Sequence, residues 1–295
     1  MSKKFEKKYI TFLKFTAFTL PATLCMVIVC LLPFGMNVGY SFTKWNGVSR
    51  NIEWIGLENY IEIFTDDPQF LEAAIFTMLH TILFVILVNF AAFVVAVFLT
   101  QKIHFSGVLR AFFFIPNTFS LVIVGFMWTF LFSTGFQKLY QMSGLKVFDL
   151  PWLGKPNYAF FAILLVSIWQ GLGYYMVIYI AGLQMVPGEL LESAQIDGAG
   201  FLKQVCHVYL PMIRPTISIC VFLALSNGVR VFDVIFTLTK GGPGTTTNSL
   251  SINIYNEAYN FNRYGYGTAK SVLFFVVIVF VSLLQQWAFR RKEEK

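Results

Sequence analysis

Long apolar runs separated by more polar segments dominate this chain. Each run has at least 21 residues, and a helix of about 20 residues crosses the roughly 30 Å of hydrocarbon in a membrane. The first run is too long for a cleavable signal and has no clear small-residue cleavage site after it, so we expect it to be retained. The pattern predicts six spanning helices, over Phe15–Met36, Ala73–Leu99, Ala111–Phe132, Tyr158–Leu183, Pro215–Thr239 and Ala269–Phe289.

Composition supports a membrane protein. Hydrophobic residues make up 57% of the chain, charged residues only 13%, and the mean hydropathy is +0.66. An ordinary soluble domain has about 25% charged residues, and a soluble fold of this length could not bury so much apolar surface. The four cysteines have no C-x-x-C spacing, which argues against a metal centre or a disulfide framework. The predicted class is an all-α integral membrane protein.

The basic residues indicate how the chain is oriented. The net charge of +7 does not predict a nucleic-acid partner, because the basic residues collect near the chain ends and not on one helix face. With the N-terminus inside the cell, the cytoplasmic segments hold 13 Lys and Arg and the outer segments hold 7. Cytoplasmic loops carry the excess of basic residues. We therefore predict a multi-pass protein of the cell membrane with both termini in the cytoplasm.

Two polar segments are expected to have structure of their own. The outer segment 37–72 is acidic, has turn signals at Asn46-Gly47 and Asp67-Pro68, and contains an amphipathic stretch over Leu57–Phe64. The cytoplasmic segment, called the 184–214 loop below, predicts a short helix with Pro187 in its first turn. Gly198 breaks that helix, and a second helix from Phe201 to Tyr209 is closed by Leu210-Pro211.

The 184–214 loop resembles the EAA loop of ABC-importer permeases, which reads E-A-A-x-x-D-G-A followed by an apolar stretch and L-P. Here Ser193 replaces an alanine and Val205 stands where phenylalanine is common. The resemblance implies a coupling helix that docks on an ATPase subunit; the competing interpretation is a plain amphipathic interfacial loop. The docking residues it implies are Glu192, Ser193, Ala194, Asp197, Gly198, Ala199 and Gly200.

Other segments resemble carbohydrate-type (maltose and multiple-sugar) permeases: Leu57-Glu58-Asn59-Tyr60, Trp169 to Tyr175, and Leu238 to Gly244. The resemblance implies the type I, MetI-like fold, with residues 1–70 as tail, first span and outer loop, 71–290 as the permease core and 291–295 as a cytoplasmic tail. It also implies the partners: a second homologous permease forming a heterodimer, two ATPase subunits that hold ATP and Mg, and an extracytoplasmic sugar-binding protein. No cofactor is expected on this chain.

The fifth predicted span carries polar residues at helical spacing. Ser226, Arg230, Asp233 and Thr237 follow at steps of four, three and four, so a continuous helix would place them on one face. Such residues inside a membrane usually face a bundle interior or a wet cavity. This face is interpreted either as a polar wall of a transport path, with Asn227 for sugar hydroxyls, or as a structural Arg230–Asp233 ion pair.

The fourth span offers complementary groups. Gly171 and Gly173 remove side-chain bulk, and Tyr174 and Tyr175 combine a ring with a hydroxyl; helix packing and an interfacial aromatic belt are the competing interpretations. The resemblance implies that substrate contacts lie in this span and in 224–231. Together the two spans give the predicted substrate path: Gln170, Gly171, Tyr174, Ser226, Asn227, Gly228, Arg230 and Asp233.

Signatures of catalysis are weak. Gly265 to Ser271 has the wrong spacing for a phosphate-binding loop, and His80, His104 and His207 do not have metal-ligand spacing. The sequence therefore predicts no catalysis in this chain. The resemblance implies a transport subunit: the permease of an ATP-driven importer for a sugar of the oligosaccharide class, working by alternating access. The alternative is an ion-coupled secondary transporter that uses Arg230 and Asp233.

Overall fold

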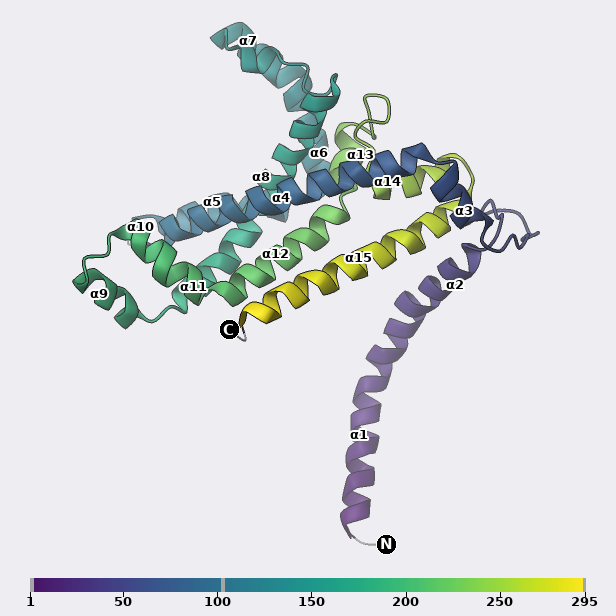
Figure 1. Cartoon of the computed structure of the whole chain (residues 1–295), viewed down its shortest axis with the longest axis horizontal. Helices are drawn as coiled ribbons and strands as arrows, with labels where there is room; N and C mark the ends of the chain where they lie inside the picture. The colour runs from purple at the N-terminus through teal and green to yellow at the C-terminus, as the bar shows by residue number, and fades with distance from the viewer. Residues whose placement is uncertain (1–2, 102–103, 294–295) are drawn as a thin grey trace. The chain divides into compact units, whose positions relative to one another are not determined.

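The computed structural model describes residues 3–101 and 104–293, and these residues are helical with connecting loops (Figure 1). Within those two ranges no β-strand forms, and one isolated antiparallel bridge joins Thr43 to Trp54. The α-helices are α1 (Lys3–Met26), α2 (Leu32–Tyr40), α3 (Glu58–Thr65), α4 (Pro68–Thr100), α5 (Ser106–Thr118), α6 (Leu121–Phe130), α7 (Phe136–Ser143), α8 (Pro156–Gln184), α9 (Gly188–Ile196), α10 (Phe201–Gln204), α11 (Leu210–Met212), α12 (Arg214–Val229), α13 (Asp233–Leu238), α14 (Leu250–Tyr255) and α15 (Tyr264–Glu293).

Short segments of other helix types interrupt this series. A 3-10 helix, η3, covers Lys146–Asp149, and the π-helical segments are η1 (Val27–Leu31), η2 (Leu131–Gly135), η4 (Val205–Tyr209) and η5 (Asn256–Asn260). The chain divides into two compact units. The first unit contains Met1–Asp66 and Ile254–Phe275, and the second contains Asp67–Asn253 and Val276–Lys295. The segment Ile254–Phe275 thus packs with the N-terminal part of the chain. The predicted division at residue 70 places these two segments in different parts.

The spanning helices largely follow the apolar runs. Among the described residues, five helical segments are long and apolar enough to cross a membrane, and a sixth arises if Phe201–Met212 and Arg214–Val229, bent by 76°, form one span. The prediction of an all-α integral membrane protein is confirmed. The five straight segments are Leu13–Tyr40, Pro68–Thr100, Leu121–Ser143, Pro156–Gln184 and Tyr264–Ala288.

The predicted third span is wrong in its position. It was expected over Ala111–Phe132, but α5 ends at Thr118, and the spanning segment runs from Leu121 to Ser143. Phe119 adopts an extended backbone between α5 and α6. The apolar run crosses this break because α5, which packs against α8, is itself apolar. Hydropathy alone does not distinguish a helix that packs on the protein from the span that follows it, so it predicts one span across both.

The beginning of α4 depends on a side-chain cap. Pro68 occupies the first turn, and the Asp67 carboxylate accepts a hydrogen bond from the backbone N–H of Phe70 at 2.9 Å. We expect Asp67→Ala to lower the free energy of unfolding by about 1 kcal/mol, because such a cap satisfies one of the unpaired N–H groups of the first turn. Unfolding in a detergent titration measures this. Asp66→Ala removes the same charge without removing the cap and serves as the control; an equal loss in both variants would contradict the cap.

The second unit is built around α4 and α8, which pack on each other, while α12 packs on α4 and α5 on α8. In a membrane no hydrophobic driving force brings helices together. Small residues favour packing there because they let two helices approach closely. A Cβ added to Gly182 would lie 2.4 Å from the Thr216 hydroxyl oxygen, and one added to Gly228 would lie 3.0 Å from Thr81 Cγ2. The buried core of this unit includes Val88, Ala92, Ala96, Ala162, Ile163, Met176 and Ala224.

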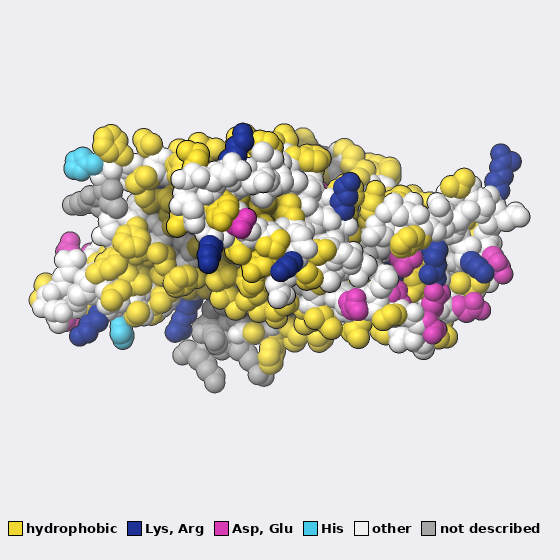
Figure 2. Space-filling model, turned by 90° about the horizontal axis from the view of Figure 1, so that it is seen from above, with side chains coloured by type: hydrophobic (Ala, Val, Ile, Leu, Met, Phe, Trp, Pro, Cys, Tyr) yellow, Lys and Arg dark blue, Asp and Glu magenta, His cyan; other side chains and the backbone are white. Residues whose placement is uncertain are grey.

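The surface is as apolar as the sequence requires. Figure 2 shows hydrophobic side chains covering broad areas of one face, with the acidic side chains gathered largely in one region beside basic ones. Exposed aromatic and aliphatic side chains are found along the spanning helices, for example Phe18, Phe90 and Phe126, which are 86%, 68% and 63% exposed. Large exposed apolar surface of this kind suits contact with lipid.

The first unit has a dense polar interior. Helix α3 forms where the amphipathic stretch predicts it, and the buried Asn59 amide nitrogen donates to the carbonyls of Ser41 and Thr43 at 2.8 and 3.0 Å. Lys270 is fully buried, and its Nζ lies 2.8 Å from Glu257 Oε1. This pairing fits the rule that a buried charge is held by an opposite charge.

Candidate functional site

The fifth span is not a continuous helix. Helix α12 ends at Val229, Arg230 caps it, and α13 begins at Asp233. The expectation that Ser226, Arg230, Asp233 and Thr237 share one helix face is therefore wrong. The sequence spacing assumed a regular helix, but the backbone unwinds between Arg230 and Phe232.

Backbone groups near this break find polar partners. The carbonyl of Val231 accepts a hydrogen bond from the buried hydroxyl of Ser249 at 2.9 Å. The N–H of Leu250, at the start of α14, donates to the Thr77 hydroxyl of α4 at 2.9 Å. Irregular backbone at membrane depth is tolerated only where it is buried in protein or lines a cavity. The partners supplied by Ser249 and Thr77 meet that condition.

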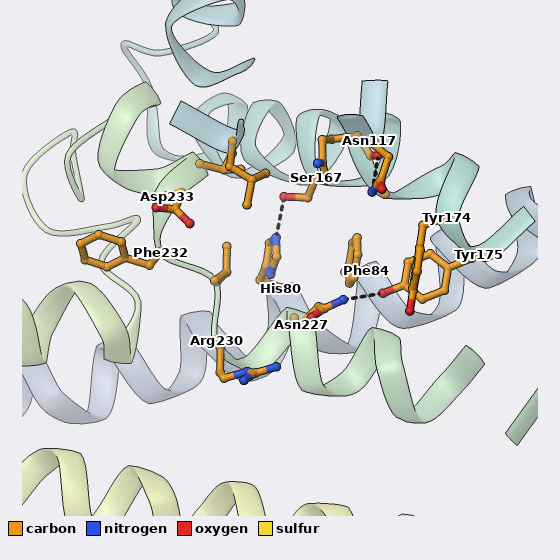
Figure 3. A pocket seen from close by; sticks show the side chains of 16 residues that line it. His80, Phe84, Asn117, Ser167, Tyr174, Tyr175, Asn227, Arg230, Phe232 and Asp233 are labelled. Carbon is orange, nitrogen blue, oxygen red and sulfur yellow. Dashed lines mark hydrogen bonds between the residues drawn. The ribbon is translucent and has the colours of Figure 1, made fainter. Parts of the chain in front are cut away.

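A cavity of ≈ 460 Å³, called the span cavity below, opens at this break. Its walls come from α4, the end of α5, the middle of α8 and the segment from Asn227 to Val234 (Figure 3). Seven of the eight predicted path residues line it: Gln170, Gly171, Tyr174, Asn227, Gly228, Arg230 and Asp233. Ser226 does not line it; its carbonyl accepts a hydrogen bond from Arg230 Nε at 2.9 Å.

The Arg230–Asp233 ion pair does not form. Among residues 3–101 and 104–293, no ion pair joins Arg230 to Asp233, and in Figure 3 the two side chains point in different directions. Arg230 turns back toward α12, whereas Asp233 lies in the first turn of α13, where the helix dipole favours a carboxylate. The unwound segment separates two groups that a helix would have placed one turn apart.

Polar groups in the span cavity are held by contacts between helices. The Asn227 amide nitrogen donates to the Tyr175 hydroxyl at 3.0 Å, which links α12 to α8. Asn117 donates to the Gln170 carbonyl at 3.5 Å, which links α5 to α8. Amides and hydroxyls can both donate and accept, so a ligand rich in hydroxyl groups can exchange hydrogen bonds with them.

Several cavity residues were missed by the sequence reasoning, chiefly His80 and Phe84 of α4, Asn117 of α5 and Ser167 and Tyr175 of α8. His80 is 1% exposed, its ring is parallel to those of Phe76 and Phe84, and its Nε2 lies 3.5 Å from Ser167 Oγ. An ionisable residue inside a span is itself a sign of function, and that signal could have identified His80. Asn117 was hidden because the third span was drawn through it.

The 184–214 loop folds into short helices with an abrupt turn between them. Helix α9 ends at Ile196, and Gly198 adopts the left-handed conformation with a φ of +75°. The N–H groups of Gly198 and Ala199 donate to the carbonyls of Gln195 and Ala194, at 3.0 and 2.9 Å. This pair of bonds is the Schellman arrangement, in which glycine is strongly favoured. The predicted break at Gly198 is confirmed.

The second helix of the loop extends beyond its predicted end. Helix continues from Phe201 through η4 and α11 to Met212, so Leu210-Pro211 does not close it. The π-helical turn ends at Tyr209, just before Leu210-Pro211. Pro211 has no N–H to donate to the preceding turn, and the wider turn accommodates its ring. The chain bends only at Ile213.

The predicted docking residues form an open surface. Glu192, Ser193, Asp197, Gly198 and Gly200 are exposed, and Ala194 and Ala199 are partly buried. Apolar side chains stand beside them: Ile196 is 86% and Leu202 75% exposed. A Cβ at Gly198 or Gly200 would meet nothing within 4 Å, so a partner can approach the backbone closely there.

A family model described as "Binding-protein-dependent transport system inner membrane component" matches residues 104–294 of this sequence. The chain belongs to this family. It is therefore a permease subunit of an ABC importer, a multi-pass membrane protein and not an enzyme. Ion-coupled transport, the alternative considered from the sequence, finds no support in this membership.

Relatives of the permease align with most of its length. A probable starch degradation products transport system permease, AmyD of Thermoanaerobacterium thermosulfurigenes, is 34% identical over 98% of this chain and 97% of its own. The multiple sugar-binding transport system permease MsmF of Streptococcus mutans is 34% identical over 91% and 92%. The trehalose/maltose permease MalF of Thermococcus litoralis is 31% identical over 84% and 87%.

The fold of the permease is similar to that of a subunit in the crystal structure of a bacterial ABC transporter that imports the acidic polysaccharide alginate. The TM-score is 0.84 at 22% identity, covering 98% of this chain and 99% of that one. This likeness confirms the predicted ABC-importer permease fold. Within the described ranges of the permease, no group of three or more His, Cys, Asp or Glu residues is placed to hold a metal ion.

Proposed function

We propose that this permease moves a sugar of the oligosaccharide class into the cell through the span cavity. The observation that carries the proposal is the lining of that cavity, where amides, hydroxyls and aromatic rings from four helices converge on the unwound part of span five. Sugars present C–H faces and a rim of hydroxyls, which aromatic rings and amides complement. Relatives named for starch degradation products, multiple sugars and trehalose/maltose support the same substrate class.

The proposed assembly contains a second, homologous permease subunit, two ATPase subunits and an extracytoplasmic binding protein. A solved relative of the fold is a complex of an ABC transporter with a periplasmic protein that carries an alginate pentasaccharide, which supports the last of these partners. ATP and Mg would bind to the ATPase subunits. Both termini and the 184–214 loop would lie in the cytoplasm, in agreement with the excess of basic residues there.

The 184–214 loop is the proposed contact with one ATPase subunit. Its exposed glycines and the apolar side chains of Ile196 and Leu202 can enter a cleft on a partner. Movement of the docked loop would then tilt α8 and α12, which flank it in the chain, and change access to the span cavity. This is alternating access, in which helices move around a fixed binding site.

Uptake of radiolabelled maltotriose by proteoliposomes tests the proposal. We expect Asn227→Leu to lower uptake at least tenfold, because it removes two donors and an acceptor from the cavity and leaves the Tyr175 hydroxyl without its partner. Assembly with the partner subunits should be unchanged, since Asn227 is exposed to the cavity. Ser226→Ala, one residue away and outside the cavity lining, is the control. Normal uptake by Asn227→Leu would remove the span cavity from the path.

A further inference from the structure

The first unit contains a cavity that the proposed path does not use. It has a volume of ≈ 360 Å³ and is called the outer-unit cavity below. The residues that line it include Trp45, three asparagines and two glutamates: Asn46, Asn59, Asn262, Glu58 and Glu62. Ligand sites in proteins have volumes of about 300–1,000 Å³ and combine apolar walls with a few placed polar groups. The outer-unit cavity has such a volume, and its lining is mostly polar, with Trp45, Ile55 and Tyr266 as the apolar part.

The charges of the outer-unit cavity cancel. Lys44 and Arg263 balance Glu58 and Glu62 in the lining. Arg263 forms an ion pair with Glu62, and its guanidinium carbon lies 3.9 Å from the centre of the Tyr266 ring. Arg263 and Glu62 are thus already paired within the unit, and Lys44 and Glu58 add one charge of each sign. A ligand with a net charge would gain little here, whereas a neutral ligand with many hydroxyls can bind without breaking the ion pair.

Two amides of the cavity, those of Asn59 and Asn46, are held in place before any ligand arrives. Asn59 is 5% exposed and uses both amide hydrogens on the Ser41 and Thr43 carbonyls, which leaves Oδ1 as an acceptor. Asn46 Oδ1 accepts from the N–H groups of Val48 and Ser49, which leaves its amide nitrogen as a donor. Groups that are already ordered lose little conformational entropy when they bind a ligand.

The aromatic wall is equally fixed. The Trp45 ring centre lies 4.5 Å from that of Tyr40 and 5.2 Å from that of Tyr264, and its Nε1 donates to the Ser49 carbonyl at 2.8 Å. The Trp45 carbonyl also accepts from the N–H of Gly265 at 2.8 Å, which joins the outer loop to the start of α15. An indole ring fixed by its neighbours suits the C–H face of a sugar ring, and nearby amides and carboxylates suit its hydroxyl groups.

We propose that the outer-unit cavity is a saccharide-binding site separate from the span cavity. The ligand class rests on the proposed function, because the molecules offered to this surface are then sugars. The competing occupant is a side chain of the binding protein. The balanced charge of the lining argues against an acidic or basic side chain and favours a neutral, hydroxyl-rich ligand.

Calorimetric titration of the assembled importer in nanodiscs, without its binding protein, tests the proposal with maltotriose and maltopentaose as probes. The informative variant is Glu58→Gln combined with Asn262→Gly. Glu58→Gln keeps the shape of the side chain, and Asn262 has a φ of +55°, a conformation that glycine adopts without strain. Glu53→Gln, in the same exposed loop but outside the cavity lining, is the matched control.

We expect the double variant to weaken one component of saccharide binding about tenfold, while Glu53→Gln leaves it unchanged and Asn227→Leu weakens a different component. Unchanged titration by the double variant, with uptake still lowered by Asn227→Leu, would overturn the outer-unit site and leave the proposed function standing. Unchanged titration together with weaker association of the binding protein would overturn it in favour of a protein contact. If the wild-type importer neither binds nor transports either probe, both proposals fail for these sugars.

Discussion

A permease carrying Gly173→Ala should not accumulate as a stable protein. A Cβ at this position would lie 2.2 Å from the Phe113 carbonyl oxygen and 2.6 Å from the Phe114 Cα, both backbone atoms of α5. Backbone cannot move aside as a side chain can, so we expect a loss of more than about 3 kcal/mol in the free energy of unfolding, above the usual 1–3 kcal/mol for overpacking. Thermal unfolding in detergent and the yield from membranes measure this.

Gly171→Ala, two residues earlier in the same helix, is the matched comparison. A Cβ there would lie 3.4 Å from Tyr175 and 3.6 Å from Phe84, which is ordinary contact, and it would project into the span cavity. We expect normal stability with reduced uptake of maltotriose. The sequence identified both glycines only as positions without side-chain bulk. The two variants would then distinguish Gly173, which is needed for helix packing, from Gly171, which lines the transport path. A stable Gly173→Ala protein would show that α5 and α8 are less closely packed than described.

A permease carrying Gly198→Trp should assemble in the membrane but lose its ATPase subunit. The added ring would cover the surface formed by the end of α9 and Gly200, where a partner can otherwise approach the backbone. Co-purification of the ATPase subunit and ATP-driven uptake should both fall at least tenfold. The change should not unfold the permease, since a Cβ at this position meets nothing within 4 Å.

Backbone strain must be separated from the bulk of the ring. Residue 198 has a φ of +75°, where a residue with a Cβ costs roughly 1–2 kcal/mol, although asparagine tolerates this region better than others. Gly198→Asn therefore keeps the turn and adds little volume. We expect it to retain most ATPase binding. Equal losses in the Asn and Trp variants would point to the turn geometry, and normal co-purification of the Trp variant would refute docking at this surface.

Membrane class, the positions of most spans and the helix–turn–helix of the 184–214 loop could be read from the sequence. These features depend on local rules: an apolar run of fixed length spans the hydrocarbon, and a glycine after a helix adopts the left-handed turn. The resemblance of the 184–214 loop to the EAA loop also predicted the ABC-importer family, because that motif is a local pattern of residues. Seven of the eight predicted path residues line one cavity, and their role in transport stays a prediction.

The predictions from the sequence were wrong where contacts with neighbouring helices determine the backbone conformation. The sequence determined that residues 111–132 and 215–239 are apolar, but only packing decided that the first contains the α5–α6 break and that the second unwinds at Arg230. Unwinding at membrane depth is tolerated because the freed Val231 carbonyl accepts a hydrogen bond from Ser249, which lies further along the chain. The same packing brought His80 and Ser167 to the span cavity. Spacing along one segment carries no information about partners on another, so the polar face of span five was visible in the sequence, whereas the cavity was decided by the tertiary structure.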